Sequence, residues 1–314
     1  LVRTGEIPGP RVYSTGPGVF WQEGISDLDE ARDVLRRYSD YFDTKTIKMY
    51  VAGNRQQRQW IIMAARELEL MPTTEGSLNL RQNLNETIDG YPGLEHSLPV
   101  YPVYGDVVRL FAETKRVYTP TLLVSYGGPW AENWFFVTEE VHDDAKLRRF
   151  YPHEEIDALT LRRGQGWFSE EEHVFPDHAC FVKDLVEAGG RAGVGSHGQL
   201  QGLGYHWELW AMQSGGLDEH DALRVATIFG AEAIGLDGDL GSIEPGKLAD
   251  LVVLRENPLD DIRNTNTVRY VMKNGRLYDG DTLAEVYPRE RPGPAYWWED
   301  EEPVGVPGIE GGGQ

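Results

Sequence analysis

The feature that most constrains this chain is the repeated alternation of short apolar segments with longer segments of helical period. Most successive apolar segments begin roughly 25 to 35 residues apart, and helical segments with one apolar face lie between them. This spacing predicts parallel βα units, because a parallel crossover has room for a helix. Six candidate strands are found: Arg11–Ser14, Thr46–Val51, Leu70–Thr74, Gly93–His96, Val117–Ser125 and Arg191–Ser196.

Local signals support the helices between these strands. The pattern Ser26-x-x-Asp29 resembles a capping box at a helix start, and Asn54 can cap the next helix. The rhythm breaks between Tyr126 and about Gly166, a stretch rich in aromatic and charged residues. It is too long for an ordinary connection, so we expect an insertion with its own helices near a binding face.

The last part of the chain has a different pattern. Leu251–Leu254, Val268–Lys273 and Arg276–Tyr278 are strand candidates without helices between them, and Asn274-Gly275 is a strong hairpin turn. We therefore expect a small antiparallel sheet beside the parallel strands. The expected domains are a partial barrel over residues 1–236 with an insertion near 126–166, accessory β-sandwich strands over 237–286, and a Pro, Gly and acid-rich tail over 287–314.

Composition excludes several functions. Net charge is −21, so nucleic acid is not an expected partner, and no long uncharged apolar run predicts a membrane span. The single Cys180 cannot form an internal disulfide, and its helical surroundings suit a buried thiol better than a nucleophile. The first residue is Leu1 and no targeting segment follows it, which suggests a chain cut at its N-terminus. The compartment, cytoplasmic or exported, stays open.

The acidic composition leads to a hypothesis of a salt-adapted source, with an ordinary acidic protein as the alternative. Salt screens the repulsion between the surplus carboxylates. The thermal unfolding midpoint is therefore expected to rise between low and molar salt. A midpoint that falls as salt is added would contradict this hypothesis.

The segment from Arg191 to Met212 passes from an apolar strand through a glycine-rich turn into an aromatic helix. Its glycines place His197 at the end of the strand. In barrels of alternating strands and helices, chemistry takes place at that end. A histidine that only fills the turn is the alternative. His142, His153, His173 and His178 lie in or beside the charged insertion without metal-ligand spacing, and we expect them to be solvated.

Several segments together resemble the amidohydrolase superfamily. They are GSIEPGKLADLVVL (Gly241–Leu254), VRYVMKNGRLY (Val268–Tyr278), HWELW (His206–Trp210), GSHGQLQGLG, PTLLVSYGG (Pro120–Gly128) and GLEH (Gly93–His96). The nearest subgroup is the amidohydrolase-like domain fused to TolB-type propellers. The resemblance covers nearly all of the chain up to about residue 290. It implies a (β/α)8 TIM-barrel-like metal-dependent hydrolase fold, here without its first two βα units, plus a small accessory β-sandwich element.

The resemblance also implies one or two divalent metals at the strand ends, with zinc first and manganese or iron as alternatives. His96 matches the sixth-strand metal histidine, and Lys48 matches the fourth-strand lysine that some members carbamylate. Glu75 replaces the expected fifth-strand histidine, and His197 replaces the eighth-strand aspartate that accepts a proton from water. The family's opening His-x-His pair has no counterpart in this chain. The expected metal set is therefore Lys48, Glu75, His96 and His197, with Lys48 and His197 catalytic.

Each of these assignments has a structural alternative. His96 could be a hydrogen-bonded core histidine, and Lys48 could form a salt bridge with a barrel carboxylate. Other chemistries lack support, since no GxSxG, phosphate-binding GxxxxGK[ST] or CxxC motif occurs.

The implied function is hydrolysis of a carbon–nitrogen bond, in a non-standard amide, a peptide-like or a cyclic amide substrate, by metal-activated water. The expected substrate contacts are Tyr126, Trp130 and Trp134 of the aromatic insertion, together with His206. The alternative is a catalytically impaired binding module. Because open sheet edges bind other strands, a homo-oligomer or a β-propeller domain is the expected protein partner.

Overall fold

A computed structural model describes residues 1–298 except Arg3, residues 20–23, Asp43, residues 51 and 52, Ser125 and residues 162–167. Five parallel strands form one sheet in the order β1-β2-β3-β4-β5. Their bounds are β1 Thr46–Met49, β2 Met71–Glu75, β3 Gly93–Glu95, β4 Val117–Thr119 and β5 Arg191–Ala192. The predicted parallel βα arrangement is confirmed for these strands, and it is consistent with a TIM-barrel-like fold.

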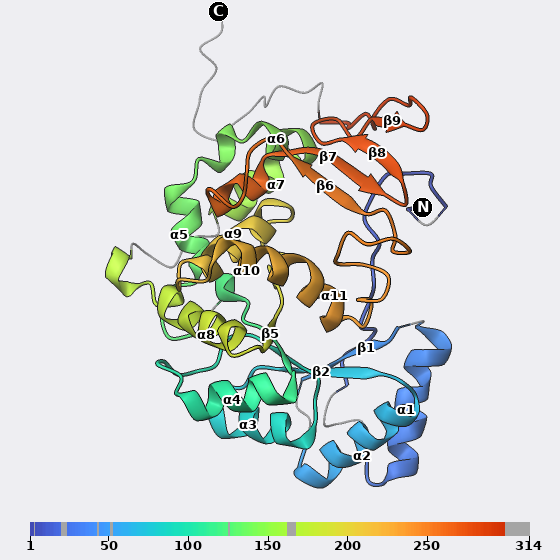
Figure 1. The fold of residues 1–314 in the computed structure, drawn as a ribbon, viewed down its shortest axis with the longest axis vertical. Helices are drawn as coiled ribbons and strands as arrows, with labels where there is room; N and C mark the ends of the chain where they lie inside the picture. Colours follow the sequence, from blue (N-terminus) through green and yellow to red (C-terminus); the bar gives the residue numbers. More distant parts are fainter. Residues whose placement is uncertain are drawn as a thin grey trace, which may run out of the picture.

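One helix precedes the first of these strands, and others lie between successive strands. They are α1 Leu28–Tyr41, α2 Arg55–Glu67, α3 Leu80–Asp89, α4 Gly105–Thr114 and α8 Phe175–Glu187. In Figure 1, α1 to α4 lie along the lower side of the molecule, outside the parallel strands. The predicted cap at Asn54 is confirmed, because its side chain and that of Gln57 form a reciprocal capping box. The N-cap of α1 is Asp27, whereas the sequence pattern suggested Ser26.

Three predicted strands differ in the structure. The strand predicted over Arg191–Ser196 ends at Ala192. Arg11–Ser14 forms no strand, and Val19 instead makes an isolated parallel bridge with Met49. The strand predicted over Val117–Ser125 ends at Thr119, because Pro120 has no N–H for the ladder and a 3-10 turn over Leu122–Val124 follows. Ser125 and the predicted strand end at Val51 lie outside the described residues.

The insertion between β4 and β5 has its own helices, as predicted. They are α5 Ala131–Thr138, α6 Ala145–Phe150 and α7 His153–Leu161, with 3-10 turns over Val141–Asp143 and Glu170–Glu172. Several of its apolar side chains belong to the main core: Phe135 is buried and stacks on Trp207 of helix α9 (Leu203–Gln213) at 5.3 Å between ring centroids. The insertion is therefore part of the fold and not a detached cover.

The remaining helices follow β5. They are α9 Leu203–Gln213, α10 Glu219–Arg224 and α11 Gly230–Ala233, and the π-helical turn Val225–Phe229 joins the last two. Buried Glu208 of α9 accepts hydrogen bonds from the backbone N–H groups of Leu122 and Leu123, at 2.8 and 2.9 Å. These bonds fix the turn that follows β4 against α9.

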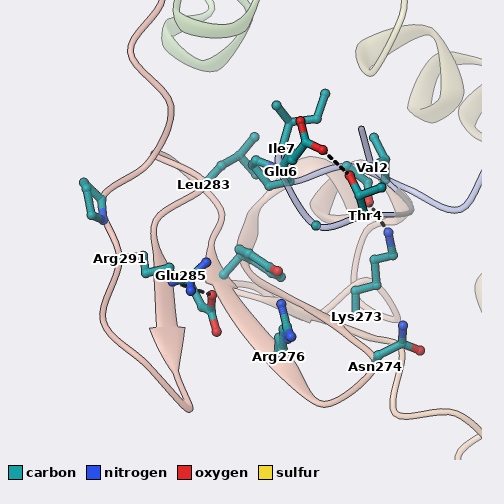
Figure 2. A pocket seen from close by; sticks show the side chains of 15 residues that line it. Val2, Thr4, Glu6, Ile7, Lys273, Asn274, Arg276, Leu283, Glu285 and Arg291 are labelled. Atoms are coloured by element: carbon teal, nitrogen blue, oxygen red, sulfur yellow. Dashed lines mark hydrogen bonds and ion pairs between the residues drawn. The ribbon is translucent and has the colours of Figure 1, made fainter.

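The antiparallel sheet expected near the C-terminus is present as strands β6 Leu251–Leu254, β7 Val268–Lys273, β8 Arg276–Asp279 and β9 Glu285–Tyr287. Its hairpin turns at Asn274 and Gly275, both with positive φ, as an Asn-Gly turn requires. The N-terminal segment reaches this sheet, where Lys273 donates to the carbonyl of Gly9 and Arg11 pairs with Asp250. Figure 2 shows the cavity of about 410 Å³ between them.

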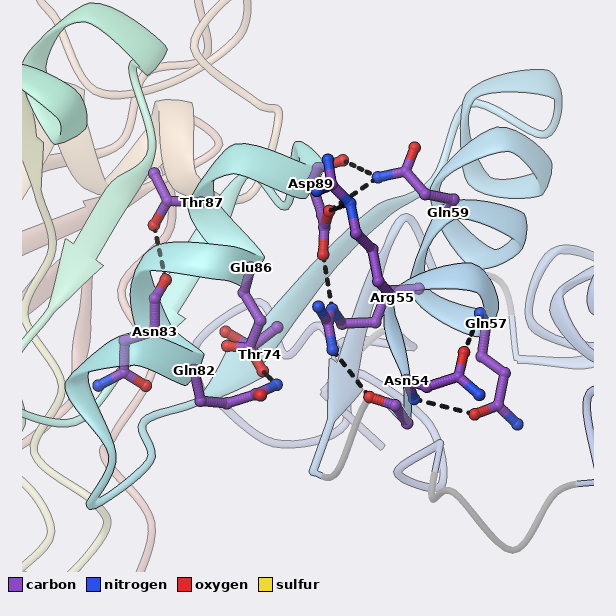
Figure 3. A network of polar contacts seen from close by, with 12 residues as sticks. Asn54, Arg55, Gln57, Gln59, Thr74, Gln82, Asn83, Glu86, Thr87 and Asp89 are labelled. Carbon is purple, nitrogen blue, oxygen red and sulfur yellow. Dashed lines mark hydrogen bonds and ion pairs between the residues drawn. The ribbon is translucent and has the colours of Figure 1, made fainter.

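A buried ion pair joins α2 to α3. Arg58 Nε lies 2.6 Å from Asp89 Oδ2, and the two side chains are 5% and 1% exposed. Arg55 and Gln59 contact the other oxygen of Asp89 at 3.2 and 3.0 Å (Figure 3). Every oxygen of this carboxylate thus has a partner, which is the condition under which a buried charge is tolerated.

Two further expectations bear on reactivity and location. Cys180 is exposed on α8, so the expectation of a buried thiol is wrong. Partial desolvation and the charges of Asp177 and Asp184 raise the pKa of this thiol, which disfavours the nucleophilic thiolate.

In the described part of the chain, no helix has the length and apolar character needed to cross a membrane.

Candidate active site

The predicted site residues lie at one end of the parallel sheet. Lys48 is in β1, Glu75 is the last residue of β2, and His96 directly follows β3. His197 lies in the loop after β5. Because neighbouring parallel strands end at the same edge of a sheet, these four side chains from separate βα units come together there.

Glu75 is the centre of this group. Its Oε2 lies 2.7 Å from Lys48 Nζ, and its Oε1 lies 2.9 Å from His96 Nε2. Burial alone would raise the pKa of Glu75, but the hydrogen bonds and charges of His96 and Lys48 outweigh burial and lower that pKa to about 2. The carboxylate is therefore ionised at neutral pH and orients both basic partners.

The two histidines lie next to each other, with ring centroids 5.3 Å apart. Both have left-handed backbone conformations, φ of 68° at His96 and 56° at His197, which are uncommon for non-glycine residues and concentrate at functional sites. Gly76 makes this arrangement possible, because a Cβ there would lie 2.5 Å from the carbonyl oxygen of Glu95.

The Nδ1 atom of His96 has no hydrogen-bond partner among the described residues. The His96 side chain is 9% exposed, and Nδ1 itself is buried. Since Nε2 faces the Glu75 carboxylate, the proton of a neutral ring belongs on Nε2, which leaves the Nδ1 lone pair available. A carboxylate that holds one nitrogen while the other binds a metal is the common arrangement for metal-binding histidines. The chemistry of this site therefore fits a divalent metal.

Tyr126 is the predicted substrate contact that lies beside this group. Its ring centroid is 6.2 Å from that of His96, and its hydroxyl donates to the carbonyl of Gly76 at 3.2 Å. Burial and the Glu75 charge raise the pKa of Tyr126, so the hydroxyl remains a neutral donor.

The other three predicted substrate contacts have different surroundings. Trp134 packs its ring against His173, and Trp130 is exposed just before α5. His206 Nδ1 lies 3.1 Å from Thr265 Oγ1, and its ring lines a separate cavity of about 240 Å³ with Lys146. Burial, followed by the Lys146 charge, lowers the pKa of His206 to about 4.

Gln199 and Glu132 were not predicted to contribute to the site. Gln199 Oε1 lies 3.3 Å from His197 Nδ1, and Gln199 Nε2 donates to Glu132 Oε1 at 3.4 Å. Burial raises the pKa of Glu132. Gln199 follows His197 by two residues, so its proximity to His197 could be expected from the sequence. Its contact with Glu132 spans 67 residues, and no local sequence pattern predicts it.

A second group of potential ligands lies in the insertion. Among the described His, Cys, Asp and Glu side chains, one group of three brings its ligand atoms within 4.8 Å of one another: His142, His153 and Asp157. The group at the strand ends is wider than this. The expectation of solvated histidines is wrong for His178, which is buried and contacts the carbonyl oxygen of Tyr126 at 3.0 Å.

Comparison with solved structures identifies the class of fold. The structure of a Xaa-Pro dipeptidase with bound methionine can be superposed on 89% of this chain. The aligned part is 70% of the dipeptidase chain, with a TM-score of 0.61 and 22% sequence identity. The chain therefore has an α/β fold similar to that of this dipeptidase.

Sequence comparison finds a similarity to a known family over part of the chain. Residues 168–278 match the Amidohydrolase family, in agreement with the motifs that suggested this resemblance. A 5-methylthioadenosine/S-adenosylhomocysteine deaminase of Teredinibacter turnerae is 36% identical over 26% of this chain and 21% of its own. Ochratoxinase of Aspergillus niger is 32% identical over 46% of this chain and 30% of its own. The chain thus spans less than a third of the length of these relatives.

Proposed function

We propose that the protein is a metal-dependent hydrolase of carbon–nitrogen bonds and that Lys48, Glu75, His96 and His197 form its active site. The observation that carries the proposal is the buried, unpartnered Nδ1 of His96, whose other ring nitrogen is held by Glu75. The match to the Amidohydrolase family over residues 168–278 supports it, because that segment contains His197.

The residues divide into two roles. His96 and His197 supply the imidazole ligands, and Glu75 holds His96 through Nε2. Direct ligation by Glu75, whose two oxygens contact His96 and Lys48, would require one of these contacts to break. Imidazole and carboxylate ligands suit zinc first, with manganese or iron as alternatives. The bound metal would supply Lewis acidity, which activates water and polarises the scissile group.

Lys48 has two possible roles in this site. Its ammonium group lies 2.7 Å from Glu75 in the structure, so it neutralises the carboxylate and fixes its direction. Carbamylation, the modification implied by the family resemblance, would convert it to an anionic ligand and break this ion pair. His197 is the most exposed member of the group, and Gln199 contacts its Nδ1, so its Nε2 can take one of two roles, metal ligand or proton acceptor from water.

The proposed substrates are small amides, peptide-like or cyclic, with Tyr126 at the edge of the site as the first substrate contact. The relatives include deaminases and a dipeptidase, and both activities cleave carbon–nitrogen bonds. Trp130, Trp134 and His206 stay predictions as substrate contacts. A homo-oligomer or a propeller domain stays the predicted protein partner.

Removal and return of metal test the proposal. The chain, stripped with a chelator and dialysed, should hydrolyse none of a panel comprising an N-acyl amino acid, an Xaa-Pro dipeptide, a cyclic amide and 5-methylthioadenosine. Zinc, manganese or iron should restore hydrolysis of at least one panel member. Without metal, the chain's own residues bind and orient the substrate but do not activate water strongly. Equal rates before and after chelation would contradict metal dependence.

A further inference from the structure

A cluster outside the proposed active site contains the ligand types of a second metal site. His142 lies in the 3-10 turn Val141–Asp143, and His153 and Asp157 lie in α7. We call these three side chains the insertion cluster. His153 is the first residue of α7 and Asp157 follows one turn later, so a single helix face presents both. The three side chains of the insertion cluster are 39% to 44% exposed, so an ion can reach them directly from solvent.

The distances within the insertion cluster suit coordination better than hydrogen bonding. His142 Nδ1 lies 3.6 Å from Asp157 Oδ1, and His153 Nε2 lies 3.5 Å from Asp157 Oδ2. Both separations exceed the ordinary hydrogen-bond range of about 2.7–3.2 Å. The two distances run to different oxygens of Asp157, but one ligand atom from each of the three residues lies within 4.8 Å of the other two. A small side-chain movement would bring these atoms to the separation of about 3.3 Å that tetrahedral ligands have when they lie about 2.0 Å from zinc.

Thr160 orients His142 for this role. The Thr160 hydroxyl donates to the carbonyl of Asp157 at 3.0 Å, so its oxygen is the acceptor in the 3.3 Å contact with His142 Nε2. The proton of a neutral His142 ring therefore belongs on Nε2. Nδ1 then presents a lone pair to the Asp157 carboxylate, and these two electron-rich groups repel unless a proton or a cation lies between them. This is the arrangement of a metal-binding histidine held through its outer nitrogen.

We propose that His142, His153 and Asp157 bind a divalent transition metal of the zinc class. Two imidazoles and one carboxylate form a three-ligand set with a remaining position for water. The ion would join the turn at residues 141–143 to α7 across the intervening helix α6, and so fix the insertion that packs against α9. The site is independent of the proposed hydrolase function, because it shares no residue with the strand-end group.

Zinc titration by calorimetry tests this assignment on the full chain. The variants are His153→Ala, Asp157→Asn, His96→Ala, and exposed His220→Ala as a matched control. We expect His153→Ala and Asp157→Asn each to remove one zinc equivalent or weaken it at least tenfold, while His96→Ala and His220→Ala retain that equivalent. Circular dichroism checks that each variant is folded. If one of the two cluster variants does not fold, the zinc titration of the other still tests the proposal.

Cobalt gives a second readout that does not depend on activity. Cobalt bound to the insertion cluster should contribute visible absorption that persists in His96→Ala. In His153→Ala this contribution should be lost, and only absorption from cobalt at the strand-end group should remain. Zinc and cobalt binding by His153→Ala and Asp157→Asn that equals that of the unsubstituted chain would overturn the proposal. So would loss of all bound metal in His96→Ala alone, since the strand-end group would then account for every ion.

Discussion

Replacement of His96 by alanine is expected to lower kcat/KM for the best panel substrate by at least about 100-fold, because it removes a metal ligand, and loss of even a supporting partner costs 10- to 100-fold. The substitution deletes the buried Nδ1 and also frees Glu75 Oε1, which His96 Nε2 contacts at 2.9 Å. The measurement is steady-state hydrolysis with zinc at a fixed free concentration.

The control for this experiment is His220→Ala, which removes an exposed imidazole on α10 and should leave kcat/KM unchanged. Higher zinc should restore little activity to His96→Ala, because the remaining ligands hold the metal in a different position. Full hydrolysis by His96→Ala at the same zinc concentration would show that the strand-end group is not the active site.

Replacement of Asp89 by alanine is expected to lower the free energy of unfolding by about 3–5 kcal/mol, because it leaves the Arg58 guanidinium buried without its counter-ion. The Arg58 side chain is 5% exposed, so water cannot replace the lost carboxylate. Urea denaturation followed by circular dichroism measures the change. Asp89 lies at the far end of α3 from the proposed site, so the loss should appear in stability before it appears in catalysis.

Asp33→Ala is the matched control for the buried pair. Asp33 pairs with Arg36 at 3.1 Å on the surface of α1, where the two side chains are 77% and 53% exposed. Exposed pairs of this kind contribute at most about 1 kcal/mol. Similar losses in Asp33→Ala and Asp89→Ala would mean that burial of the Arg58–Asp89 pair has no special effect on stability.

Much of the architecture could be predicted from local patterns. The apolar segments that became β1 to β5 are flanked by amphipathic helices and turn residues, and each such unit is specified within about 30 residues. The strand predicted at Arg11–Ser14 is absent because its apolar residues do not enter the core: Val12 and Tyr13 are exposed, and the segment is held beside the antiparallel sheet through Arg11, which pairs with Asp250. That contact spans 239 residues and has no local signal.

The two potential metal sites differ in how far the sequence indicates them. His96 ends one predicted strand and Glu75 follows another, so the rule that chemistry lies at strand ends selects them. The insertion cluster was missed because its only regular spacing is His153-x-x-x-Asp157, which is common on exposed helices. The third ligand, His142, comes from a separate turn, and only the packing of α7 through Thr160 brings it close.

Anomalous diffraction from zinc-soaked crystals tests the central claim most directly, because it locates bound metal without an assay or a known substrate. The account predicts a zinc peak at the carboxyl ends of β2 and β3, beside Nδ1 of His96. Crystals that show zinc only at the insertion cluster, or none at all, would contradict the proposal that Lys48, Glu75, His96 and His197 form a metal-dependent active site.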